Sequence, residues 1–108
     1  MIYEVRVYSA NPGRLPSLLH LFDHHVLKIW RRLRIAQVGF WTVLAGDGSN
    51  DLHCCISWDS LGDREVRWAA FEADPEWQRV RAEANKDGPI LANIDVVFLK
   101  PTSFSALK

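Results

Sequence analysis

Hydrophobic and polar residues alternate along residues 2–9, 51–58 and 90–99, which is the period expected of β-strands. Residues 36–44 are rich in β-branched and aromatic side chains, and they predict a fourth strand. The segment between the second and third strands, residues 46–50, is made of Gly, Asp, Ser and Asn. Because such residues favour turns, these two strands are expected to form an antiparallel hairpin.

Two helical regions separate the predicted strands. Residues 15–33 carry bulky apolar side chains at the i, i+3, i+4, i+7 spacing of an amphipathic helix. A second helix is expected to begin at Ser60, which can cap it. Asp74 and Pro75 interrupt this helix, since an N-cap Asp followed by Pro at the first helical position starts a new one. The chain is therefore predicted to be one α+β domain, residues 1–108, with the ferredoxin-like order βαββαβ: a four-stranded antiparallel sheet with helices on one face.

The two faces of the predicted sheet differ in character. One is uniformly apolar and is expected to lie under the helices; it consists of Tyr3, Val5, Val7, Leu52, Cys54, Ile56, Trp58, Ile90, Ala92, Ile94, Val96 and Phe98. The other mixes charged and aromatic side chains, as protein interfaces do. We expect it to pair two copies of the chain about a two-fold axis, through Glu4, Arg6, Tyr8, Trp41, His53 and Asp95. The alternative is a wet face with a few stray apolar residues.

Composition and charge exclude several classes of protein. The chain is 48% hydrophobic and 24% charged, and its formal net charge is zero. No basic surface for nucleic acid or an anionic membrane is expected, and no apolar run approaches the roughly 18 residues of a membrane span. Charges near the N-terminus argue against a signal peptide. The neighbouring Cys54 and Cys55 rarely form a disulfide, so a cytoplasmic protein with reduced thiols is expected.

His25 is the candidate catalytic residue, because an imidazole at the polar edge of the helical stripe can act as a general base near neutral pH. The alternative is a half-buried histidine bonded to a backbone carbonyl. We predict a cleft between this helix and the sheet, with a ligand resting against Phe22, Ile29, Trp30, Cys54, Ile56 and Trp58. A second possibility is an aromatic pocket lined by Trp30, Trp58, Trp68, Trp77 and Tyr3, although such residues more often form core.

No metal or cofactor site is predicted from the chain. His24 and His25 are adjacent on a helix and point to different faces, so they do not have the spacing of paired ligands. No glycine-rich phosphate loop follows a strand, which argues against nucleotide binding.

Three stretches resemble the NIPSNAP family. They are Tyr3-Glu4-Val5-Arg6-Val7-Tyr8 followed by Pro12-Gly13, Gly39-Phe40-Trp41, and Asp59-Ser60-Leu61-Gly62-Asp63-Arg64 followed by Ala73-Asp74-Pro75-Glu76-Trp77. The third strand departs from the family pattern His-Leu-Trp-Ala-Tyr, since it carries Cys54-Cys55-Ile56-Ser57-Trp58 there and its histidine, His53, lies one position away. The resemblance implies a dimeric α+β barrel, a fold group that also holds cofactor-free monooxygenases, small isomerases and haem-degrading enzymes.

Two functions are consistent with these observations. The first is a dimeric domain that binds or converts a small, largely apolar molecule, as a cofactor-free oxygenase or isomerase would. The second is a non-catalytic module for protein–protein contact. A closed cleft of ligand size favours the first function, and a filled core favours the second.

Overall fold

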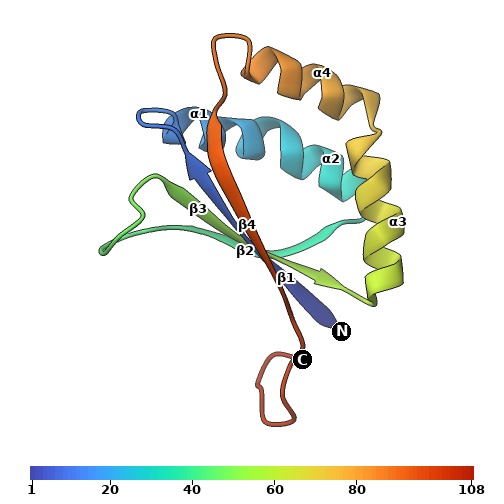
Figure 1. Ribbon diagram of the computed structural model, residues 1–108. Coiled ribbons are helices and arrows are strands. Elements are labelled where there is room, and N and C mark those ends of the chain that lie inside the picture. The colour runs from blue at the N-terminus through green and yellow to red at the C-terminus, as the bar shows by residue number, and fades with distance from the viewer.

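Helices cover one face of a four-stranded sheet and leave the other face bare (Figure 1). The computed structural model describes residues 1–108. The elements in chain order are β1 (Ile2–Ala10), α1 (Leu15–Leu21), η1 (Phe22–Val26), α2 (Leu27–Arg32), β2 (Ala36–Thr42), β3 (Asp51–Trp58), α3 (Leu61–Glu72), α4 (Pro75–Ala84) and β4 (Leu91–Leu99). The strand order is β2-β3-β1-β4, with every pair antiparallel. The predicted α+β ferredoxin-like fold is confirmed.

The first helix contains a π-helical turn that the sequence analysis did not predict. α1, η1 and α2 follow one another without a break, and the Leu27 amide donates to the carbonyl of Phe22, five residues earlier. Such a turn holds more residues than an α-helical turn, so it changes which side chains face the core beyond it, and it is frequent at functional sites. His24 and His25 both lie within it.

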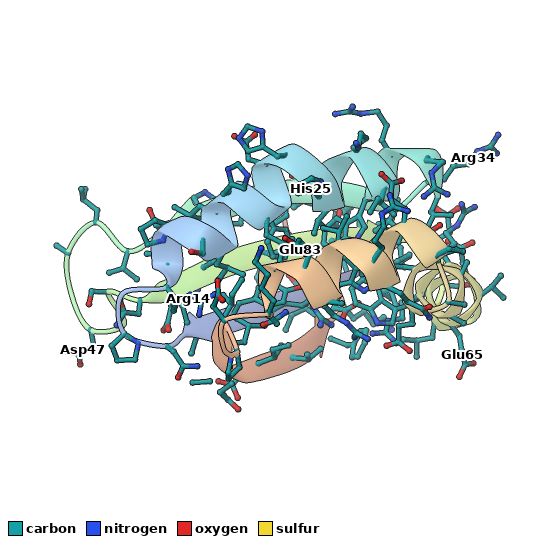
Figure 2. All side chains as sticks on the ribbon, turned by 90° about the horizontal axis from the view of Figure 1, so that it is seen from above. Arg14, His25, Arg34, Asp47, Glu65 and Glu83 are labelled. Atoms are coloured by element: carbon teal, nitrogen blue, oxygen red, sulfur yellow. The ribbon has the colours of Figure 1, made fainter.

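The helix starts at Ser60 and Asp74 are confirmed. The Ser60 hydroxyl accepts a hydrogen bond from the Asp63 amide at 3.0 Å, which caps α3. The Asp74 carboxylate accepts one from the Trp77 amide at 3.0 Å, which caps α4, and Pro75 occupies the first helical position. The chain therefore turns sharply between α3 and α4. Seen from above, α4 runs beside the first helix while α3 is seen end-on (Figure 2).

The face assigned to the first strand is wrong. In β1, Glu4 pairs with Ile56 of β3, Arg6 with Cys54 and Tyr8 with Leu52. Residues directly opposite in a sheet share a face, so the charged side of β1 lies under the helices and is buried. Tyr3, Val5 and Val7 consequently lie on the bare face, as do their β3 partners Ser57, Cys55 and His53. Glu4, Arg6 and Tyr8 thus cannot contribute the dimer contacts expected of them.

The other strands face as predicted. Leu52, Cys54, Ile56 and Trp58 of β3 are buried beneath the helices. Ile94, Val96 and Phe98 of β4 lie on the same side, opposite Tyr8, Arg6 and Glu4. On the bare face, Trp41 pairs with His53, and Asp95 pairs with Val7. The core lies between β1, β3 and the helices, and no helix has the length and apolar character needed to cross a membrane.

Candidate functional site

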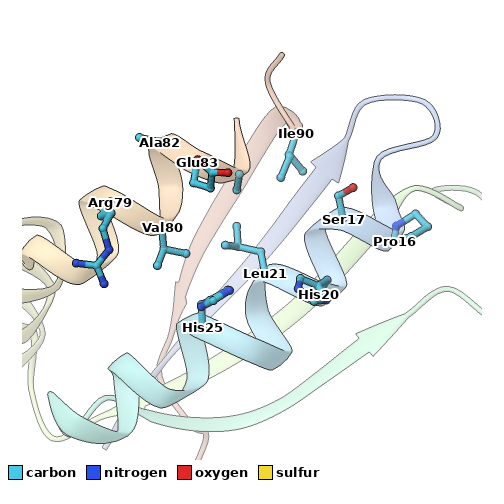
Figure 3. Close-up of a pocket in the computed structure, with 11 residues that line it drawn as sticks. Pro16, Ser17, His20, Leu21, His25, Arg79, Val80, Ala82, Glu83 and Ile90 are labelled. Atoms are coloured by element: carbon cyan, nitrogen blue, oxygen red, sulfur yellow. The ribbon is translucent and has the colours of Figure 1, made fainter. Parts of the chain in front are cut away.

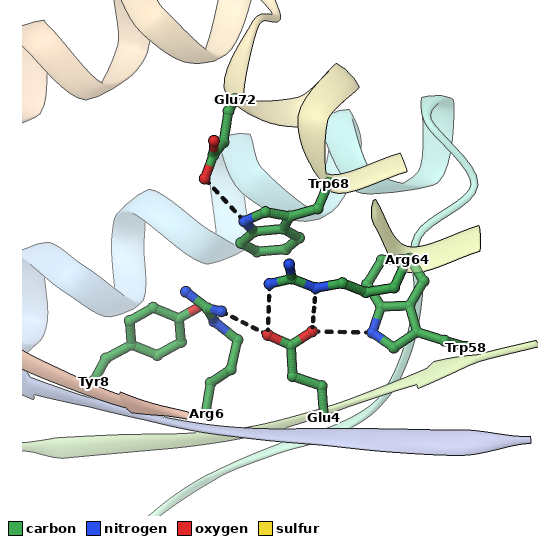
Figure 4. Close-up of polar contacts among 7 residues, drawn as sticks. All are labelled: Glu4, Arg6, Tyr8, Trp58, Arg64, Trp68 and Glu72. Atoms are coloured by element: carbon green, nitrogen blue, oxygen red, sulfur yellow. Dashed lines mark hydrogen bonds and ion pairs between the residues drawn. The ribbon is translucent and has the colours of Figure 1, made fainter. Parts of the chain in front are cut away.

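A buried cluster of charged side chains lies at the centre of the helix-covered face (Figure 4). Glu4 of β1 is completely buried and accepts four hydrogen bonds. Arg6 Nη1 donates to Oε2 at 2.7 Å, and Arg64 of α3 donates to both oxygens at 3.1 Å. The Trp58 indole donates to Oε1 at 3.0 Å. These donors explain why a carboxylate can occupy the core, since buried charges persist only when they are paired and hydrogen-bonded.

Burial and the charges of the cluster shift the pKa values of Glu4, Tyr8 and Cys54. Burial by itself would raise the pKa of Glu4, but the hydrogen bonds and charges of Arg64 and Arg6 outweigh it and hold that pKa below its ordinary value. Burial raises the pKa of Tyr8 strongly, so its hydroxyl keeps its proton. Burial likewise raises the pKa of the Cys54 thiol to about 12. At neutral pH Glu4 is therefore charged, and Tyr8 and Cys54 are neutral.

A cavity of about 310 Å³ lies beside this cluster, between the helices and the sheet. Most of its lining is apolar and much of it is aromatic; it includes Tyr8, Leu18, Leu21, Phe22, Val26, Trp30, Trp68, Phe71, Trp77, Ile90, Leu91 and Ile94. Its polar lining consists of Arg6, Glu72, Arg81 and Asn85. A volume of this size and an apolar wall with few polar groups are typical of small-molecule sites.

Arg6 and Tyr8 form the polar floor of the cavity. Arg6 Nε donates to the Tyr8 hydroxyl at 2.7 Å, and the Arg6 guanidinium lies 4.5 Å from the centre of the Trp68 ring. This stacking and the bond to Glu4 fix the orientation of the guanidinium. The Trp30 indole nitrogen is buried and has no hydrogen-bond partner in the chain, and its ring also lines the cavity.

His25 lies elsewhere, in a surface groove between the first helix and α4 (Figure 3). The groove has a volume of about 940 Å³ and is also lined by His20, Leu21, Arg79, Val80, Glu83 and Ile90, among others. His25 and Val80 point toward each other across it. Leu21 and Ile90 line both the groove and the interior cavity, so these two side chains stand between His25 and the cavity.

The residues predicted to bind a ligand therefore do not form one site in the structure. Phe22 and Trp30 line the interior cavity. Ile29, Cys54, Ile56 and Trp58 are buried core and line neither the cavity nor the groove. A cavity does lie between the first helix and the sheet, but His25 is not part of its wall and lines the groove between this helix and α4 instead.

Several cavity residues were assigned elsewhere or missed. The sequence predicts Arg6 and Tyr8 in the interface, because their side of the first strand mixes charged and aromatic residues as protein interfaces do. Of the five residues predicted for an aromatic pocket, Trp30, Trp68 and Trp77 line the cavity, whereas the Trp58 indole donates to Glu4 and Tyr3 lies on the opposite face of the sheet. Arg64 was not considered as a partner for Glu4. No pattern within β1 points to Arg64, because this second, partly buried cation lies on α3, sixty residues further along the chain.

The bare face of the sheet is more apolar than predicted. It carries Val5, Val7, Cys55, Val97 and Leu99 together with Trp41, His53 and Asp95. Tyr3 lies on this side too, but it is buried, and its hydroxyl donates to the carbonyl of Lys108 in the C-terminal segment at 2.8 Å. The Trp41 ring packs against Gly39, where an added Cβ would approach the ring to 2.7 Å. No group of three or more histidine, cysteine or acidic side chains is placed to hold a metal ion.

The resemblance to a known family is confirmed over almost the whole chain. The NIPSNAP family model matches residues 3–106. The chain belongs to the NIPSNAP family. The NIPSNAP match covers β1, with the buried Glu4 and Arg6, and both α3 and α4, which form one wall of the cavity. A comparison with curated proteins found no match.

Solved NIPSNAP structures have the same architecture. Protein Atu4242 from Agrobacterium tumefaciens is 27% identical with a TM-score of 0.87, and the match covers 100% of both chains. A NIPSNAP-like domain protein from Burkholderia xenovorans is 27% identical with a TM-score of 0.85, over 96% of this chain and 87% of that one. The monooxygenase ActVA-Orf6 of Streptomyces coelicolor, solved with the ligand nanaomycin D, is 19% identical with a TM-score of 0.62, over 94% and 88%. This last likeness is one of fold alone.

Proposed function

We propose that this NIPSNAP domain binds, and as a cofactor-free oxygenase or isomerase converts, a small and largely apolar molecule in the interior cavity. The observation that carries the proposal is the cavity of about 310 Å³ beside the Arg6–Tyr8 pair, with an aromatic wall. A module used only for protein–protein contact has no need of a cavity in its core, because an empty apolar space lowers stability. ActVA-Orf6, a monooxygenase of similar fold, was solved with nanaomycin D, which supports a ligand role for this architecture.

The cavity supplies two of the elements that such catalysis needs. Its apolar walls exclude water, which strengthens electrostatic interactions inside. Its floor holds a guanidinium in a fixed orientation, and a preorganised cation stabilises negative charge that develops on a substrate oxygen. His25 has no place in this proposal, since Leu21 and Ile90 separate it from the cavity.

The test is calorimetric titration with 2-naphthamide, a neutral two-ring probe. Ile94 of β4 lines the cavity and is 40% exposed, so Ile94→Trp should obstruct the site without disturbing the core. Val96 lies on the same side of the same strand, is 41% exposed and does not line the cavity, so Val96→Trp is the matched control. We expect 2-naphthamide to bind the natural protein and Val96→Trp equally well, and Ile94→Trp at least about tenfold more weakly.

A second variant tests the position of the site. His25→Ala should leave the affinity for 2-naphthamide unchanged, because the imidazole lines the outer groove rather than the cavity. Absence of binding to the natural protein by 2-naphthamide and by its carboxylate analogue would contradict the proposed function. Loss of binding in His25→Ala but not in Ile94→Trp would instead move the site to the groove.

We also propose that two copies pair through the bare face of the sheet. Solvent does not favour a flat surface with Trp41, Val97 and Leu99 about half exposed, and patches of this kind mark interfaces. The face carries few charges that pairing would have to bury; Asp95 lies on it, beside Val7. Trp41 and His53, predicted as interface residues, remain part of this proposal.

A further inference from the structure

The charges around the cavity floor do not balance. Glu4 carries the negative charge of the cluster, and Arg6 and Arg64 carry two positive charges. The other titratable side chains there, Tyr8 and Cys54, are neutral because burial raises the pKa of each. At the cavity mouth Glu72 and Arg81 are both exposed and have opposite charges. The cluster therefore carries one net positive charge, and of its two arginines Arg6 is buried whereas Arg64 is 23% exposed and reaches solvent.

Two hydrogen-bond donors of this cluster have no partner within the chain and belong to residues that line the cavity. Arg6 uses Nε on Tyr8 and Nη1 on Glu4, while its Nη2 makes no hydrogen bond within the chain. The Tyr8 hydroxyl accepts from Arg6, and its own proton has no acceptor within the chain. Both residues line the cavity. Two adjacent donors, one of them charged, thus face the same space.

No acceptor in the lining receives a hydrogen bond from either of these two donors. The Glu72 carboxylate accepts from the Trp68 indole at 3.1 Å. The Asn85 side-chain oxygen accepts from the Ile90 amide at 2.9 Å. Among the side-chain polar atoms sealed from solvent, Trp30 Nε1 alone lacks a partner. Arg6 Nη2 therefore reaches the open space of the cavity, where a charged donor is available to a ligand. A polar group on a ligand is the partner that the cavity geometry can accommodate.

The placement of the guanidinium suits an anion better than a neutral acceptor. Arg6 stacks on Trp68 and is tied to Glu4 and Tyr8, so it is oriented before any ligand arrives. A charge-assisted hydrogen bond in a low-dielectric cavity is about twice as strong as a neutral one. The aromatic side chains around it, Phe22, Trp30, Phe71 and Trp77, fit a flat ring system.

We infer that the cavity receives an aromatic molecule with one anionic oxygen group, a carboxylate or a phenolate, which accepts hydrogen bonds from Arg6 Nη2 and from the Tyr8 hydroxyl. The inference rests on the proposed ligand site and specifies the class of molecule that occupies it. Glu4 acts as a positioning residue, because it binds Arg6 and does not line the cavity, and Arg64 in turn holds Glu4 in place.

The experiment compares 2-naphthoate with the near-isosteric neutral 2-naphthamide by calorimetry at pH 7. We expect the natural protein to bind 2-naphthoate about tenfold more tightly or better. Tyr8→Phe removes one donor and keeps the ring, so it should weaken 2-naphthoate binding by roughly threefold to tenfold. Arg6→Gln leaves Glu4 paired with Arg64 and Trp58, and it should abolish the preference for the anion.

Arg79→Gln is the matched control, since this exposed arginine of α4 lines the outer groove and not the cavity. It should retain the preference for 2-naphthoate. Equal affinity of the natural protein for the two probes would overturn the inference and leave the proposed cavity site standing. Failure of both probes to bind would overturn the inference together with the proposed function. If Arg6→Gln does not fold, the affinities of the natural protein for the two probes and the affinity of Tyr8→Phe for 2-naphthoate still test the inference.

Discussion

Single charged residues decide how the core of this protein is built. Glu4 lies where an alternating strand would normally place an apolar residue, and it is tolerated because Arg6, Arg64 and Trp58 together supply four hydrogen bonds. These residues come from β1, β3 and α3, so the cluster ties the strand layer to the helix layer. Its integrity is expected to depend on the charge of Glu4.

Glu4→Gln should lower the free energy of unfolding by about 3 kcal/mol at pH 7, because it leaves two arginines without their carboxylate. The pKa of Glu4 is lowered in the folded state from a reference of 4.5. Its ionisation therefore stabilises the fold above about pH 4.5, and this contribution is lost as the pH falls through the folded-state pKa. Urea unfolding at several pH values should show the gap between the two proteins shrinking below pH 4.5.

Glu83→Gln is a suitable comparison, since Glu83 forms an exposed ion pair with Lys86. Such pairs contribute little to stability, so this variant should unfold almost as the natural protein does. A gap between Glu4→Gln and the natural protein that stays constant from pH 7 to pH 3 would contradict the assigned ionisation.

At the level of elements, helix breaks shape the cavity. The π-helical turn of η1 contains Phe22 and Val26, and both line the cavity. The break between α3 and α4 lets α3 supply Trp68 while α4 supplies Trp77. Asp74 fixes this break, because its carboxylate caps α4 and also accepts a hydrogen bond from Arg32 of α2 at 2.9 Å.

Asp74→Ala should lower the free energy of unfolding by about 1 kcal/mol through loss of the cap. The contact with Arg32 should add little, since the arginine is half exposed. Asp74→Asn keeps an oxygen that can accept from the Trp77 amide, and we expect it to retain most of the stability. Thermal or urea unfolding measures both, and an unchanged midpoint for Asp74→Ala would show that Pro75 alone positions the helix.

At the scale of the whole molecule, the bare sheet face determines the expected assembly. The helices cover only one side of the sheet (Figure 1). The other side presents the Trp41 ring, which packs against Gly39, with Val97 and Leu99 on the edge strand β4. A second copy placed on this face would bury about 1,600 Å² in a standard interface.

Trp41→Glu should shift the protein from dimer toward monomer, because it puts an unpaired charge into the proposed interface. Val66→Glu is the control, since Val66 lies on α3 and is exposed on the helix side. Sedimentation velocity at micromolar concentration should show a dimer for the natural protein and for the control. A monomeric natural protein at that concentration would end the dimer proposal.

The sequence by itself determined the order and type of the elements. Their signals are local: the alternation in the strands, the apolar stripe of the first helix, and the caps at Ser60 and Asp74 all act within a few residues. Local signals also placed Trp41, His53 and Asp95 on the bare face. The π-helical turn was not predictable from the spacing of apolar residues. One extra residue in a single helical turn leaves an apolar stripe that still matches the period of an α-helix.

Only the tertiary structure decided which side of β1 is buried and where the cavity lies. Alternation shows that a strand has two faces, but it cannot say which face is inside when one carries charges. The answer depended on Arg64, sixty residues from Glu4 along the chain, which supplies the second cation that makes burial of the carboxylate possible. Leu21 of α1 and Ile90, which line both the groove and the cavity, likewise separate His25 from the cavity. Both outcomes depend on contacts between distant segments, which residue patterns along one strand or helix do not encode.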